Sequence, residues 1–236
     1  VFMSAFKGGI YIPLLLLLFM IPKRNFGEKV KYPVVVASAI LLAVVTFAAV
    51  NSNIFKDVSS STSGSENELM WTESEGFTLR RMFTHPKEAL CMLFNTFFLM
   101  GGTHYAEMFA SGFGWLQIYT SGFLTAGFTV LMVLTLLNCE GREICFNKKQ
   151  RIISLSAAAV SIFIIVISMW IFWTPAGSAH IVGLQGRYFI PLLFCAVYPL
   201  KNSRCIIKKD IGGGIIFAAV MFHALTFWEI YIRMAV

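Results

Sequence analysis

Charged side chains are scarce in this sequence, whereas long apolar runs are abundant. Asp, Glu, Lys and Arg make up 13% of the 236 residues, and hydrophobic residues make up 57%. Soluble domains carry about 25% charged residues. The composition therefore excludes an ordinary soluble domain and predicts an all-α fold, a polytopic bundle of membrane helices.

The motifs of soluble nucleotide-binding and hydrolytic enzymes are also missing. The sequence holds no P-loop, no dinucleotide-binding glycine motif, no zinc-protease motif and no nucleophile elbow. Its five cysteines do not suggest a disulfide framework, because Cys139, Cys145 and Cys205 fall in or beside basic loops that we place in the reducing cytoplasm. Cys139 and Cys145 have no neighbouring histidine or second cysteine pair, so we expect no zinc there. The sequence identifies no cofactor and is compatible with a divalent metal.

The net charge of +7 carries topological information and does not indicate nucleic-acid binding. The basic residues cluster in short loops between apolar runs, at 22–32, 138–151 and 201–209, which is typical of cytoplasmic loops. The chain begins at Val1 inside an apolar run, without the charged start or cleavage site of a signal peptide. We therefore expect the sequence to be the C-terminal part of a longer protein.

A membrane-spanning helix needs about 20 apolar residues. Six predicted spans are Val1–Ile21, Pro33–Val50, Ile118–Leu137, Ile152–Trp173, Ile181–Leu200 and Ile211–Ile232. Ala89–Gly102 is too short and suggests an interfacial or re-entrant helix. If it crossed the membrane, the basic loops 22–32 and 138–151 would face opposite sides, against the positive-inside rule. We therefore predict a single transmembrane domain over 1–236 with about six spans, and an extracytoplasmic loop over 51–117.

Arg187 is the strongest candidate for a functional residue, because it is the only charge between Arg151 and Lys201. An arginine in an apolar segment is costly, which makes function the default hypothesis. Its guanidinium suits phosphate and carboxylate groups, and the nearby Gly183 and Gly186 allow close approach to the backbone. We predict that Arg187 faces an outer-leaflet cavity and holds an anionic group.

Four further residues are candidates for the same substrate site. Gln185 and Tyr188 flank Arg187, His180 precedes it, and Lys7 lies in the outer half of the first span. Three of them have a structural alternative: helix packing for Gln185, an aromatic belt for Tyr188, and snorkelling for Lys7. Arg187 itself could instead snorkel, or pair with Glu229 at the outer end of the last span.

Other polar residues are weaker candidates. His104 and Glu107 are three apart, so a helix would place them on one face, where a metal or acid–base role is one interpretation. Trp115 suggests an interface anchor or a stacking residue, and His223 a core histidine. Most polar residues gather on the outer side, and the broken helices of a transporter are not evident. This one-sidedness favours a site at the outer surface that a lipid-bound substrate reaches.

Three stretches resemble one bacterial family. The sequence GLQGRYFIPLL, preceded by TPAGSAHIV, resembles the closing signature of domain-of-unknown-function family twenty-one forty-two. RMFTHPKEALCMLFNTFF looks like the outer segment of that family, and SGFGWLQ like its Gly-Trp turn. Lys7 followed by Tyr11-Ile12-Pro13 is similar to the start of its second half. The resemblance covers most of the chain, and the Gln-Gly-Arg-Tyr motif is its most specific part.

This resemblance implies a relation to the GT-C membrane glycosyltransferases. Such enzymes transfer a sugar from a polyprenyl-phosphate or polyprenyl-diphosphate carrier to an acceptor outside the cytoplasm. The family would thus place Gln185, Arg187 and Tyr188 at the carrier. The catalytic acidic residue of such enzymes, a carboxylate that would serve as the base, usually lies in an early outer loop that this sequence lacks, so no catalytic residue is carried over.

Three functions stay open at this point. The first is a cell-membrane glycosyltransferase that uses a polyprenyl-linked sugar and a cell-surface glycan acceptor. The second is a non-catalytic carrier binder or translocator of the same surface-polysaccharide pathway. The third is a structural membrane subunit. A lateral cavity lined by Arg187, Gln185 and Lys7 would favour the first two, and a pairing of Arg187 with Glu229 would favour the third.

Overall fold

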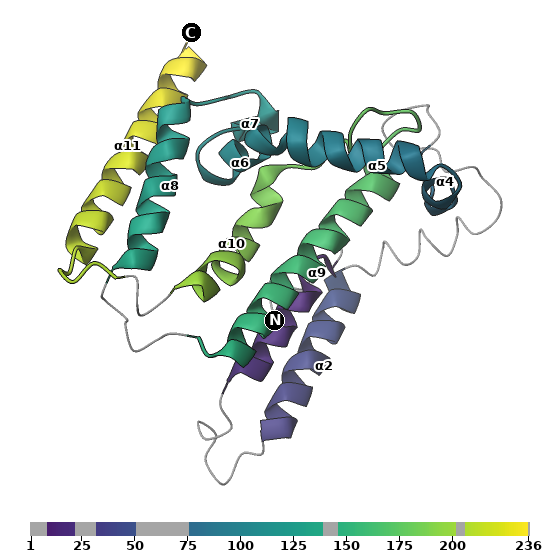
Figure 1. Cartoon of the computed structure of the whole chain (residues 1–236), viewed down its shortest axis with the longest axis horizontal. Coiled ribbons are helices and arrows are strands. Elements are labelled where there is room, and N and C mark those ends of the chain that lie inside the picture. Colours follow the sequence, from purple (N-terminus) through teal and green to yellow (C-terminus); the bar gives the residue numbers. More distant parts are fainter. Residues whose placement is uncertain (1–8, 22–31, 51–75, 139–145, 202–205, 236) are drawn as a thin grey trace. The chain divides into compact units, whose positions relative to one another are not determined.

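The computed structural model describes residues 9–21, 32–50, 76–138, 146–201 and 206–235, and all regular elements in these ranges are helical (Figure 1). The predicted all-α membrane fold is thus confirmed. The chain divides into two compact units, residues 1–94 with 148–184 and residues 95–147 with 185–236.

Three described helices are long and apolar enough to cross a membrane: α2 (Tyr32–Val50), α9 (Lys148–Trp173) and α11 (Gly212–Ala235). They correspond to three of the predicted spans, with ends shifted by up to four residues. At 1.5 Å per residue, the 24 residues of α11 extend about 36 Å, enough for the hydrocarbon core. Helix α8 (Gly122–Leu137) is apolar but shorter, and begins four residues after the predicted start.

In the first unit, α9 packs against a 3₁₀ helix, η2 (Ile12–Met20), which also contacts α2. The side chain of Gln150 donates to the carbonyl of Met20 at 3.3 Å. The second half of the predicted span Val1–Ile21 thus forms a 3₁₀ helix and not an α-helix. The first eight residues, including Lys7, lie outside the described part of the chain.

The C-terminal end of α9 is closed by the segment that follows it. Thr174 is fully buried; its hydroxyl donates to the Met169 carbonyl at 3.0 Å and accepts from the Val182 amide at 3.1 Å. The Phe77 amide donates to the Thr174 carbonyl at 2.9 Å, and the Phe77 ring lies 5.3 Å from that of Trp170. Thr174 therefore fixes the path of the TPAGSAHIV stretch over the helix end.

The predicted interfacial segment begins earlier than expected. Helix α4 (Leu79–Thr84) leads into α5 (Pro86–Phe94), and Arg81 pairs with Glu88 at 3.1 Å. Figure 1 shows α5 crossing the direction of α9 rather than running alongside it. Phe83 is 80% exposed and Leu90 66% exposed. An exposed apolar surface beside charged groups suits a helix at the membrane surface.

The second unit continues with a π-helical turn, η4 (Asn95–Leu99), then α6 (Gly101–Phe109) and the short α7 (Phe113–Leu116). Helices α8 and α11 pack side by side (Figure 1). Gly127 of α8 lies against the Phe222 ring, where a Cβ atom would overlap it. The side chain of Asp210 accepts the Gly212 amide at 2.8 Å and caps the start of α11.

The predicted span Ile181–Leu200 is not one regular helix. The chain is irregular up to Gln185, forms a 3₁₀ turn, η5 (Gly186–Phe189), then α10 (Ile190–Val197) and a final 3₁₀ turn, η6 (Tyr198–Leu200). Proline lies in the first turn of both α10 and η6, where its missing amide is tolerated. Arg187 therefore sits in a tight turn that precedes the α-helix.

Candidate functional site

A buried carboxylate holds the Arg187 segment in place. Glu107 of α6 has a side chain only 5% exposed, and its Oε2 accepts the backbone amide of Gly186 at 2.5 Å. The same oxygen lies 3.4 Å from Nδ1 of His104, one helical turn earlier. The second unit thus joins α6 to the first residue of η5 through a side chain that has little access to solvent.

Two glycines make this contact sterically feasible. A Cβ atom on Gly186 would overlap the carbonyl oxygen of His104, and one on Gly112 would lie 2.8 Å from Cγ of Glu107. Gly112 also has a positive φ of 69°, which favours glycine. The SGFGWLQ and GLQGRY stretches therefore meet at Glu107, although 74 residues separate Gly112 from Gly186.

The turn around α7 has an unusual backbone. Gly112, Gly114 and Leu116 have φ values of 69°, 65° and 62°. Amide–carbonyl hydrogen bonds in both directions join Phe113 and Ile118, at 3.0 and 3.4 Å, and close the turn. A leucine in the left-handed region costs about 1–3 kcal/mol and persists only where its surroundings fix it. The turn is therefore a shaped element and not a loose connection.

Arg187 presents an exposed guanidinium on this framework. Its Nε donates to Oε1 of Gln185 at 2.5 Å, and its Nη1 makes a long contact of 3.5 Å with the carbonyl of Gly114. Within the described ranges, no carboxylate lies within ion-pair distance of Arg187. Its remaining donors are free to bind an anion in the bidentate geometry that guanidinium favours.

Glu229 pairs with Arg233 in the structure and not with Arg187, which was the alternative considered from the sequence. Glu229 accepts the amide and hydroxyl of Ser121 at 2.8 and 2.9 Å, and Arg233 donates to it at 2.8 Å. These bonds tie α11 to the start of α8 and leave Arg187 without this partner.

Electrostatics at Glu107 favour its ionised form. Burial acts to raise the pKa of this carboxyl, but the hydrogen bonds from His104 and the Gly186 amide, together with the nearby guanidinium of Arg187, outweigh burial and lower the pKa. Glu107 is thus a carboxylate at neutral pH. It contributes negative charge in the vicinity of Arg187 without forming an ion pair with it.

The other predicted residues have different positions. Tyr188 is half-buried next to Arg187 in η5. His180 is half-buried in the loop after α9, within the first unit, and Lys7 and the side chain of Trp115 lie outside the described part. His223 is exposed and bonds the Ala219 carbonyl at 2.7 Å, so its assignment to the core was wrong.

Sequence reasoning undervalued Glu107. The three-residue spacing to His104 suggested a metal or acid–base pair, but the described residues contain no group of three or more potential metal-ligating side chains. Within the described chain, Nε2 of His104 is buried and has no hydrogen-bond partner. The sequence shows only that Glu107 is an acidic residue between apolar stretches. Its partner is the backbone amide of Gly186, and a sequence does not indicate which backbone amide a carboxylate will bind.

The fold and this site define a membrane protein built from apolar helices, with an exposed arginine on a glycine-rich turn. Residues 1–196 match the family model described as "Predicted membrane protein (DUF2142)", and the chain belongs to that family. No curated protein and no solved structure matches the chain significantly.

Proposed function

We propose that this protein binds the phosphate group of a polyprenyl-linked sugar and takes part in transferring the sugar to a cell-surface glycan. The protein would act as a multi-pass protein of the cell membrane. The observation that carries the proposal is the exposed guanidinium of Arg187, which has no carboxylate partner among the described residues and is oriented by Gln185. A cation in this setting recognises a phosphate ester.

An apolar groove next to Arg187 supports a lipid carrier. Helix α10 begins three residues after Arg187, and a cavity of about 380 Å³ lies between this helix and α8. Its lining is almost wholly apolar: Met132, Thr135, Leu136, Ile190, Leu193, Phe194, Val197 and Tyr198. Along α10 the lining extends for about 10 Å at 1.5 Å per residue. The groove could thus take isoprene units while the phosphate stays at Arg187.

The proposed transfer follows from these positions. The hydroxyl oxygen of the acceptor attacks the anomeric carbon, the bond between that carbon and the phosphate oxygen breaks, and the phosphate leaves with the electron pair. A base takes the hydroxyl proton. Arg187 stabilises the charge that grows on the phosphate, which is the step where a fixed cation is most effective. Glu107 serves as a positioning residue, because its carboxylate is buried and already bound to Gly186.

Carrier binding by the protein in nanodiscs tests this function directly. We would measure the affinity for a long-chain polyprenyl phosphate in the wild type, Arg187→Ala and Arg187→Lys. Loss of a charge-assisted contact worth about 1.5–3 kcal/mol should weaken binding about 10- to 100-fold in the alanine variant. Lysine should retain part of the affinity, because it keeps the charge but loses the planar fork.

Lys209→Ala is the matched control. This substitution removes one positive charge from an exposed position elsewhere in the second unit. It should bind like the wild type. Equal affinity of Arg187→Ala and the wild type would refute the proposal, and so would an equal loss in the Lys209 variant, since that result would reflect net charge alone.

A translocator of the same carrier is a second candidate, and one observation favours it. The Gly186–Leu200 segment is interrupted by 3₁₀ turns at both ends, and transporters often bind substrate at discontinuous helices. Flipping of a labelled polyprenyl phosphate in proteoliposomes without any acceptor glycan would distinguish this function from sugar transfer.

A further inference from the structure

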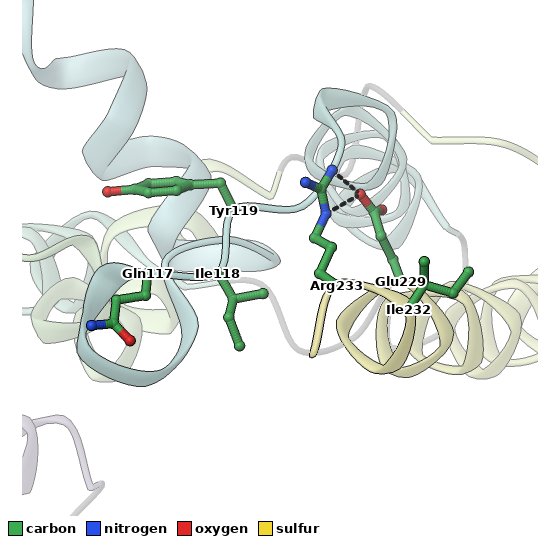
Figure 2. A pocket seen from close by; sticks show the side chains of 6 residues that line it. All are labelled: Gln117, Ile118, Tyr119, Glu229, Ile232 and Arg233. Carbon is green, nitrogen blue, oxygen red and sulfur yellow. Dashed lines mark hydrogen bonds and ion pairs between the residues drawn. The ribbon is translucent and has the colours of Figure 1, made fainter. Parts of the chain in front are cut away.

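A second cavity in the second unit does not have Arg187 among its lining residues. It has a volume of about 560 Å³ and is lined by Gln117, Ile118, Tyr119, Glu229, Ile232 and Arg233. Figure 2 shows that the first three residues follow α7 in the chain and that the other three belong to α11. The volume lies in the range of small-molecule sites.

The cavity offers polar groups that the protein itself does not use. Among the described residues, the side-chain amide of Gln117, the hydroxyl of Tyr119 and Nη1 of Arg233 have no hydrogen-bond partner. Gln117 is exposed and Tyr119 is 48% exposed. Nη1 of Arg233 can donate to a ligand hydroxyl, whereas the Gln117 amide and the Tyr119 hydroxyl can both donate and accept.

The charge of this cavity differs from that around Arg187. Arg233 donates through Nε and Nη2 to Oε1 of Glu229, at 3.1 and 2.8 Å, so the two charges compensate each other (Figure 2). An anionic ligand would meet the carboxylate as well as the guanidinium and would gain little. An uncharged ligand with many hydroxyls meets no such penalty. Ile118, Ile232 and the Tyr119 ring add apolar surface for its C–H faces.

Two exposed aromatic side chains lie on the same end of α11 as the cavity-lining residues Glu229 and Ile232. Trp228 and Tyr231, on the last turns of this apolar helix, are 62% and 66% exposed. Exposed tryptophan and tyrosine near the end of a spanning helix are typical of the headgroup region. We therefore expect a ligand there to be accessible from water and from the membrane surface.

The α7 turn connects the cavity to the Arg187 site. Nη1 of Arg187 contacts the carbonyl of Gly114, and Gln117 comes three residues later. Three residues span at most about 11 Å. The left-handed backbone at Gly114 and Leu116 sets the direction in which the chain reaches Gln117 and Tyr119. The α7 turn therefore contacts the Arg187 side chain and also positions the cavity residues Gln117 and Tyr119.

We infer that the cavity between the α7–α8 connection and α11 is a binding site for an uncharged saccharide. Sugar binding at this site does not depend on sugar transfer. The residues that line the site do not include Arg187. It is suited to present an acceptor sugar beside a carrier phosphate.

Saturation-transfer NMR on the protein in nanodiscs tests this site. The probes are glucose, galactose, mannose and rhamnose, with glucose 6-phosphate and glucuronic acid as charged counterparts. At least one uncharged sugar should bind with a dissociation constant on the order of 1–10 mM. Its affinity should fall at least about tenfold in Gln117→Ala and in Tyr119→Ala, since each removes an exposed ligand-facing group.

The controls separate this site from the carrier site. Tyr231→Ala removes another exposed tyrosine of the second unit that does not line the cavity, and it should retain the affinity. Tyr119→Phe loses the hydroxyl but keeps the ring, so its loss of affinity should be smaller than that of Tyr119→Ala. Arg187→Ala should leave sugar binding unchanged. The inference is overturned if none of the four uncharged sugars binds, if the charged sugars bind more tightly, or if the Gln117 and Tyr119 variants bind as the wild type does. Failure of carrier binding alone would leave this result intact.

Discussion

The backbone amide of Gly186 donates a 2.5 Å hydrogen bond to the buried carboxylate of Glu107, and this bond links α6 to the turn that carries Arg187. A charge-assisted hydrogen bond in a buried setting is stronger than a neutral one. Because Gly112 packs against the same side chain, Glu107 organises both glycine stretches of the second unit. Four predictions concern the contacts of Gly186, Glu107 and Thr174 and the groove between α8 and α10.

Gly186→Ala should destabilise the protein by about 3 kcal/mol, because the new methyl group overlaps the His104 carbonyl and must displace α6 or η5. Carrier binding should fall with it, since Arg187 is the next residue. Thermal unfolding in detergent measures the first effect. Gly213→Ala is the control, because a Cβ atom there meets nothing within 4 Å; it should be neutral or slightly stabilising. Equal melting temperatures for both variants would contradict the tight packing at Gly186.

Glu107→Gln should lower stability at pH 7 by about 1–3 kcal/mol, since the amide keeps the shape but loses the charge that strengthens the Gly186 bond. The lowered pKa of Glu107 also predicts the pH dependence. The wild-type carboxylate stabilises the fold above the ordinary glutamate pKa of about 4.3, and this contribution disappears as the pH falls through the lower folded pKa.

Unfolding measured from pH 7 down to pH 3 should therefore show a steeper acid-side loss for the wild type than for Glu107→Gln. The two stability curves should approach each other toward the lowest pH, as the wild-type carboxyl becomes protonated. Parallel curves over the whole range would show that ionisation of Glu107 does not stabilise the fold.

Leu193→Trp should block the groove between α8 and α10, because a larger side chain fills space that an isoprenoid chain would occupy. The affinity for a long-chain polyprenyl phosphate should fall about tenfold, a change of about 1.4 kcal/mol. Isopentenyl phosphate, which presents the same phosphate with a single isoprene unit, should bind as before. Phe217→Trp, at a position on α11 that is 68% exposed, is the control. If Leu193→Trp lowers the affinity for both ligands equally, the groove does not bind the isoprenoid chain.

Thr174→Val should destabilise the first unit by about 1–3 kcal/mol, because it keeps the side-chain shape but leaves the Met169 carbonyl and the Val182 amide without their partner. Thr174→Ser keeps the hydroxyl and should cost less. Thermal unfolding of the two variants under identical conditions measures the difference. If valine is tolerated as well as serine, then the hydroxyl bonds do not hold the 174–182 loop.

Much of the helical architecture could be predicted, and the reason is visible in α9 and α11. Both are long apolar runs between polar loops, and the hydrocarbon core imposes a length and a composition that a sequence displays directly. The Ile181–Leu200 run was less predictable, because apolar composition does not distinguish an α-helix from a 3₁₀ turn. Gly186, together with the proline in the first turn of α10, marks the interruption only in retrospect.

The sequence alone determined that this is an all-α membrane protein and that Arg187 is its most unusual residue, because a lone charge in an apolar run stands out without any structure. Only the tertiary structure decided what surrounds that charge. The contact of Glu107 with Gly186 and the cavity between Tyr119 and Glu229 each join residues at least 79 positions apart. Such contacts depend on how the helices pack. Every residue except proline has a backbone amide, and a cavity is made by several distant residues together, so neither can be identified from residue types alone.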